Sequence, residues 1–151
     1  MLSRTHLAIT IFFILLFISY VENKVAFVIA ALIATLLPDV DSRYSLLGRK
    51  KPFRILQFFT RHRHVIHSFT FLILITLILL WFFPIIALGF FLGYGIHLLA
   101  DSFTIDGITP FYPWKEKASG KVRTGSRKEI SIFVLFVIFD VILLGMKVLN
   151  I

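Results

Sequence analysis

The chain has 151 residues, of which 58% are hydrophobic and 16% are charged. Soluble domains usually carry roughly 45–50% apolar and about 25% charged residues, so this composition argues against a soluble domain and favours a membrane protein. The sequence contains no cysteine, which excludes disulfides and thiolate metal sites.

Five apolar segments follow one another along the chain, at residues 7–21, 25–37, 69–83, 85–100 and 130–149. They predict an all-α integral membrane bundle of about five transmembrane helices, forming a single domain over residues 1–151. The first two segments are shorter than the roughly 20 residues that a spanning helix needs, so they could instead form a short or re-entrant hairpin. No small-residue cleavage site follows the first segment, so we expect it to be retained rather than removed as a signal peptide.

Basic residues are concentrated on one side of this arrangement. The regions before residue 7, between 38 and 68, and between 101 and 129 hold one, seven and six of them, which is 14 of the 16 Lys and Arg residues. The positive-inside rule makes this side cytoplasmic, which predicts a multi-pass protein of the cell (inner) membrane with a cytoplasmic N-terminus. The net charge of +8 then reflects loops beside anionic headgroups of the lipid bilayer, and nucleic acid is not an expected partner.

The strongest chemical motif is His97-Leu-Leu-Ala-Asp101, at the end of the fourth apolar segment. Residues four apart share one face of a helix, so this imidazole and carboxylate can bind one metal together. Alone, such a pair is more often a hydrogen-bonded pair at a helix end.

A second motif, residues 61–68 (RHRHVIHS), precedes the third segment and contains His62 and His67. Interfacial basic residues that bind headgroups are the simple interpretation, but His67 directly precedes an apolar run and needs a polar partner there. The third motif places Asp39 and Asp41 just after the second segment, where they could converge on one cation or form a helix-terminating turn.

His6 precedes the first segment at the same predicted depth, whereas Asp140 lies inside the fifth segment. We interpret Asp140 as a structural residue that forms a hydrogen bond, because a carboxylate within a membrane needs a partner. His6 and the three motifs all lie at the predicted cytoplasmic edge. Nitrogen and oxygen ligands without sulfur suit Zn²⁺, with Mn²⁺ or Fe²⁺ as alternatives, and their number would allow one or two ions.

Taken in order, these motifs resemble the YdjM family, LexA-regulated inner-membrane proteins described as metal-dependent hydrolases. The resemblance extends to about Trp114 and rests on Thr5-His6, residues 37–41, His62-Arg63, His67-Ser68 and residues 97–101, followed by Thr104, Gly107 and Pro113-Trp114. It implies a metal site in the membrane, and it supports that site better than any particular substrate.

We therefore predict a membrane-bound metal-dependent hydrolase that acts on a phosphoester or lipid-type substrate at the cytoplasmic face. Asp41 would be a general base or a further ligand, and Arg63 would bind the substrate anion. A metal-ion transporter or sensor, and a non-catalytic membrane protein with a structural metal, remain the alternatives. The predicted metal ligands are His6, Asp39, His62, His67, His97 and Asp101.

Overall fold

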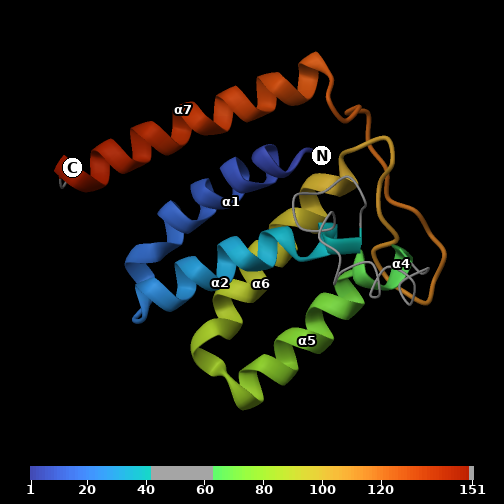
Figure 1. Cartoon of the computed structure of the whole chain (residues 1–151), viewed down its shortest axis with the longest axis horizontal. Coiled ribbons are helices and arrows are strands. Elements are labelled where there is room, and N and C mark those ends of the chain that lie inside the picture. The colour runs from blue at the N-terminus through green and yellow to red at the C-terminus, as the bar shows by residue number, and fades with distance from the viewer. Residues whose placement is uncertain (42–62, 150–151) are drawn as a thin grey trace.

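The computed structural model describes residues 1–41 and 63–149, with the backbone alone at 40, 41, 63 and 64. This part of the chain is all-α, as predicted, and its helices pack side by side into a bundle (Figure 1). The main helices are α1 (Ser3–Phe17), α2 (Lys24–Leu36), α5 (Phe69–Phe82), α6 (Pro84–Ser102) and α7 (Arg127–Leu149). Short helical turns η1 (Ile18–Tyr20), η2 (Pro38–Asp41) and α4 (Arg63–Ile66) adjoin them.

Three helical segments of the described chain are long and apolar enough to cross a membrane. They are α1 together with η1 (Ser3–Tyr20), α6, and α7. Helices α2 and α5 are apolar but have only 13 and 14 residues, so each is about 20 Å long at 1.5 Å per residue. A bilayer core is about 30 Å thick, so length alone does not make these two helices spans, and α2 is short as expected.

Helices α2 and α6 approach each other closely because small residues line their contact. A Cβ atom on Gly93 would lie 2.0 Å from the carbonyl oxygen of Ala31, and one on Gly89 would lie 2.5 Å from that of Phe27. Gly89 and Gly93 form the GxxxG spacing that lets membrane helices pack backbone to backbone. The same face of α6 continues through residue 97, so this contact also fixes where His97 meets α2.

The first and last helices are joined through Glu129, which is 1% exposed. Its Oε1 accepts hydrogen bonds from the backbone N–H of Leu2 at 2.6 Å and from the hydroxyl of Thr5 at 3.0 Å. Its Oε2 accepts from the N–H of Gly125 at 2.5 Å. One carboxylate therefore satisfies N–H groups at the start of both α1 and α7, which would otherwise lack partners.

The connection between α6 and α7 folds back over the start of α5 (Figure 1). Isolated bridges pair Thr104 with Val122 and Ile108 with Ala118. The N–H of Phe69 donates to the carbonyl of Pro110 at 2.8 Å, and Ile108 is buried in the same core cluster as Leu72 of α5. This loop therefore holds the start of α5 in place.

Helices α1, α5 and α7 begin at one end of the bundle, and α2 and α6 finish there (Figure 1). The amide and carbonyl groups that lack helical partners at these helix ends are thus gathered in one layer, together with the polar side chains that flank each helix.

Candidate metal centre

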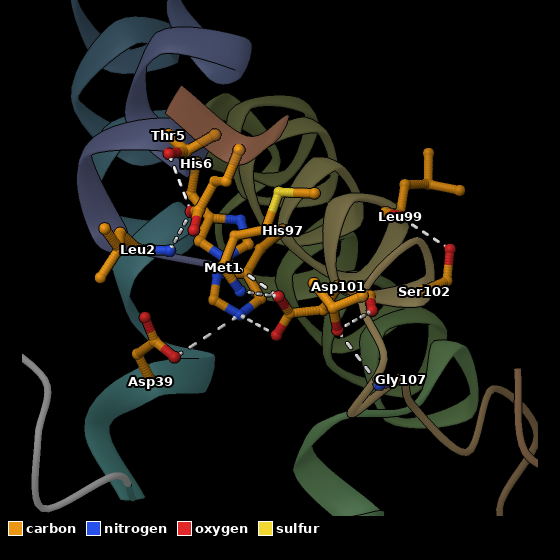
Figure 2. A network of polar contacts seen from close by, with 12 residues as sticks. Met1, Leu2, Thr5, His6, Asp39, His97, Leu99, Asp101, Ser102 and Gly107 are labelled. Atoms are coloured by element: carbon orange, nitrogen blue, oxygen red, sulfur yellow. Dashed lines mark hydrogen bonds and ion pairs between the residues drawn. The ribbon is translucent and has the colours of Figure 1, made fainter. Parts of the chain in front are cut away.

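Five side chains from four segments of the chain meet at this end of the bundle, and Figure 2 shows four of them pointing toward one another. Two overlapping groups, His6 with Asp39 and His97, and His67 with His97 and Asp101, each place their ligand atoms within 4.8 Å of one another. The two groups together are hereafter the His/Asp cluster: His6, Asp39, His67, His97 and Asp101.

The ring of His97 is fixed by the end of α2. Its Nδ1 lies 2.7 Å from the carbonyl oxygen of Thr35, which can only accept, so Nδ1 carries the proton. The carbonyl is available because Thr35 belongs to the last turn of α2, where carbonyls lose their helical partners. A backbone carbonyl on one imidazole nitrogen is the usual arrangement that orients the other nitrogen toward a metal.

The remaining nitrogen of His97 faces two carboxylates. Its Nε2 lies 3.8 Å from Asp39 Oδ1 and 3.5 Å from Asp101 Oδ2 (Figure 2), and it has no hydrogen-bond partner among the described residues. In the neutral ring this atom presents a lone pair to two negative oxygens, which is repulsive. A cation between them, either a second proton or a metal ion, makes the arrangement favourable.

His6 lies against the same groups. Its ring stacks on that of His97, with centroids 4.0 Å apart and planes 11° from parallel, and its side chain is fully buried. Nε2 lies 3.2 Å from Asp101 Oδ1, yet neither ring nitrogen forms a hydrogen bond with a described residue. Burying ring nitrogens without hydrogen bonds is costly, and a coordinated metal ion would offset that cost.

His67 enters from the turn before α5, with its ring centroid 5.7 Å from that of His97. The backbone on both sides of it is tied down. The hydroxyl of Tyr94 donates to the carbonyl of Ile66 at 2.7 Å, and Ser68 caps α5 by accepting from the N–H of Phe71 at 3.2 Å. His67 is therefore held in position by its neighbours in sequence as well as by the cluster.

The two carboxylates are the partly open side of the cluster. Their side chains are 19% and 14% exposed for Asp39 and Asp101, whereas those of His6 and His97 are fully buried. The amino group of Met1 also contacts Asp101 Oδ1, so this carboxylate already has a cationic neighbour. A ligand would approach along the carboxylates, with the imidazoles behind them.

Both groups of potential ligands share one atom, His97 Nε2, because Nδ1 is engaged by Thr35. One nitrogen lone pair binds one ion at a time, so the two groups cannot each hold an ion through His97. The two groups would therefore hold one ion in alternative positions, or two ions of which His97 would bind only one. The donor set of imidazole and carboxylate without thiolate suits Zn²⁺, Mn²⁺ or Fe²⁺ in either case.

The other predicted site residues lie outside the region for which side chains are described. His62 falls among residues 42–62, and the side chains of Asp41 and Arg63 are not described.

Asp140 is half-buried within α7, and its Oδ1 forms no hydrogen bond with a described residue, so the partner expected for that atom is not found there.

Two groups that help to position the cluster were not identified from the sequence, the side chain of Glu129 and the carbonyl of Thr35. Glu129 was not singled out, although the run Ser126-Arg-Lys-Glu129 has the Ser-x-x-Glu spacing of a capping box at a helix start. No sequence pattern marks the carbonyl of Thr35, because every residue has a backbone carbonyl. Only the packing of α2 on α6 brings this one to His97.

Comparison with known proteins agrees with the membrane character of the fold. The model of a family described as "YdjM inner membrane protein" matches residues 1–150. A curated relative, the "Uncharacterized protein YvsG" of Bacillus subtilis (strain 168), is 29% identical over 85 residues, covering 54% of this chain and 53% of that protein. The match thus spans about half the length of the curated relative, and no solved structure matches. With a family match over nearly its whole length, an all-α bundle and three helices long enough to span, the chain belongs to the YdjM family of inner membrane proteins.

Proposed function

We propose that this protein is a membrane-bound metal-dependent hydrolase whose metal is held by the His/Asp cluster. The observation that carries the proposal is the environment of His97. Its Nδ1 is fixed by the Thr35 carbonyl while its unpaired Nε2 faces two carboxylates. A structural hydrogen-bonded pair would not need two further imidazoles beside it, one of them buried without a hydrogen bond.

In this proposal Asp39, His97 and Asp101 hold the ion together with His6 and His67, and His62 is a further candidate ligand. The bound ion would act as a Lewis acid that stabilises negative charge developing on the substrate. Asp41 follows Asp39 by two residues, and we assign it as general base or additional ligand. Arg63 would bind the anionic part of the substrate.

The substrate that we propose is a phosphoester in a lipid or at the membrane surface. The open side of the cluster lies at the end of the bundle, where helices meet the interface, rather than at mid-span. In the sequence, 14 of the 16 basic residues fall before residue 7, between 38 and 68, and between 101 and 129, which favours anionic substrates and, by the positive-inside rule, a cytoplasmic location of these regions. These features support a reaction on a headgroup more than on an acyl chain.

Packing beneath the cluster favours a surface reaction over transport. One turn deeper, the hydroxyl of Thr35 donates to that of Thr10 at 2.9 Å, and both residues are fully buried. Below them Ile14, Phe27 and Ala31 form an apolar cluster in which each residue is 4% exposed or less. A transported ion would need polar partners along this path, and this part of the described chain offers none.

The test begins with metal content. The full chain in mild detergent should retain one or two equivalents of Zn, Mn or Fe by elemental mass spectrometry, and His97→Ala and Asp101→Asn should lose them. Asp106→Asn is the matched control, because Asp106 is an exposed carboxylate five residues away from Asp101. Absence of metal in the wild type after reloading would remove the basis for the proposal.

Activity is then measured with phospholipid monoesters and diesters in mixed bilayers, following phosphate or headgroup release with each metal. We expect turnover in the wild type and in Asp106→Asn, and none in His97→Ala. Metal binding without turnover on any phosphoester would leave a structural metal as the better interpretation and reject the hydrolase.

A further inference from the structure

The loop between α6 and α7, residues 103–126 and hereafter the basic loop, exposes large aromatic side chains. Trp114 is 70% exposed, Phe103 is 63% exposed and Phe111 is 55% exposed. Such rings are unfavourable in water, where each leaves a large apolar area unburied. Because all three rings lie in one loop, their exposure indicates a surface that contacts an apolar environment.

Basic side chains follow Trp114 in the same loop. The exposed ones are Lys115, Lys117, Lys121 and Arg123, against two exposed acids, Asp106 and Glu116. Aromatic rings next to lysines are what the interface of a bilayer selects, because rings lie at the headgroup level and ammonium groups pair with lipid phosphates.

The backbone of the basic loop is held by hydrogen bonds and close packing. The Thr104 hydroxyl accepts from the N–H of Gly107 at 3.1 Å and donates to the carbonyl of Asp101 at 2.7 Å. A Cβ atom on Gly120 would lie 2.2 Å from the carbonyl oxygen of Phe103, so the two arms of the loop touch. The exposed rings are therefore presented by a packed loop.

The position of the basic loop places it beside the His/Asp cluster. The loop begins at the end of α6, two residues after Asp101, and crosses the start of α5, where the N–H of Phe69 donates to the carbonyl of Pro110 at 2.8 Å (Figure 1). There the ring of Phe111 lies 6.4 Å from that of Phe69. The rings and the lysines thus belong to the end of the bundle that lies in the interface.

We propose that the basic loop is a binding surface for anionic phospholipid headgroups. Trp114 and Phe111 lie at the boundary between headgroups and acyl chains, and Lys115, Lys117 and Lys121 pair with lipid phosphates. The charge of the loop complements an anionic leaflet, which is the property that selects this occupant over a zwitterionic lipid. This binding does not depend on the proposed hydrolase activity.

The two tryptophans allow a direct test, because Trp81 lies at the opposite end of α5 and is 83% exposed. Two variants of the full chain each keep one reporter, Trp81→Phe and Trp114→Phe. They are placed in phosphatidylcholine bilayers that contain equal fractions of dibrominated phosphatidylglycerol or dibrominated phosphatidylcholine, and fluorescence quenching is compared. Trp114 should be quenched more strongly by the brominated anionic lipid, and Trp81 equally by both.

Charge neutralisation identifies the source of the preference. In the Trp81→Phe background, Lys115→Gln, Lys117→Gln and Lys121→Gln together should abolish the preference while leaving quenching by brominated phosphatidylcholine unchanged. The matched control, Lys24→Gln with Lys147→Gln, removes charge at the other end and should keep it. A lysine beside an anionic leaflet strengthens association roughly fivefold, so the contrast between triple variant and control should be large.

Three results would overturn the proposal. Equal quenching of Trp114 by the two brominated lipids would show no selection for anionic headgroups. A preference that survives in the triple variant would assign it to other groups. A short DNA duplex that changes Trp114 fluorescence where anionic lipid does not would make nucleic acid the partner of this loop.

Discussion

Replacing Gly93 by alanine tests whether the close contact of α2 and α6 sets the geometry of the His/Asp cluster. The new Cβ would lie 2.0 Å from the Ala31 oxygen, whereas real Cβ contacts essentially never fall below 3.0 Å. The helices must therefore separate by about 1 Å at this point. Carried one turn along α6, the same shift lengthens the bond between His97 Nδ1 and the Thr35 oxygen from 2.7 Å to about 3.7 Å, beyond hydrogen-bond range.

Two effects should follow in Gly93→Ala. Overpacking of this kind costs about 1–3 kcal/mol of stability, which thermal unfolding in detergent would detect. Loss of a carbonyl that orients a metal-bound imidazole typically costs roughly 10–100-fold in metal affinity, which competition with a chelator would measure. The second effect is the informative one, because Gly93 itself is no candidate ligand.

Gly95→Ala is the matched control on the same helix. Its Cβ would lie 3.5 Å from the nearest atom, a Leu72 methyl carbon, which is an ordinary contact. We expect near-wild-type stability and metal affinity for this variant. If Gly93→Ala binds metal as tightly as Gly95→Ala, the helix contact does not position His97 and our reasoning about the site is wrong.

Three further predictions concern the bonds around the cluster. Glu129→Ala should lower the free energy of unfolding by about 1–3 kcal/mol, measured by thermal unfolding, because it leaves buried donors at the start of α1 unpaired. Lys147→Ala is the control, since it removes only an exposed hydrogen bond to Ser19, and an equal effect of the two variants would contradict this prediction. Thr35→Val removes the bond to Thr10 and should cost about 0.5–1.5 kcal/mol, yet metal content should stay unchanged because the backbone carbonyl remains. Metal binding should weaken as the pH falls, because a proton competes with the metal for each imidazole nitrogen. Undiminished binding at about pH 4 would argue against histidine ligands.

Much of the architecture could be predicted because membrane helices leave a strong sequence signal. Long apolar runs marked the helices, and the position of His97 four residues before Asp101 predicted their common face. The chain alternates short turns with long loops, so the helix ends next to the long loops were predicted to lie in one layer. These features depend on local pattern and connection length, which a single sequence contains.

The details that make the cluster a candidate site could not be predicted, since they arise from packing. Stacking of His6 on His97 requires α1 and α6 to meet at one depth and one rotation. The bond to Thr35 depends on the approach that Gly93 and Ala31 permit. Neither helix rotation nor interhelical distance can be read from apolar periodicity in segments that are apolar on nearly every face.

The hydrogen bond between Leu2 and Glu129 also bears on the order in which the helices assemble during synthesis. The two residues are 127 positions apart, so Leu2 cannot form this bond until residue 129 has been translated. His6 lies one turn further along α1. During synthesis, the first helix would enter the membrane early but would reach its final position only after α7 has been made. In a chain truncated before α7, His6 would therefore be less firmly positioned. Metal loading would then report that α7 has been made and has joined α1.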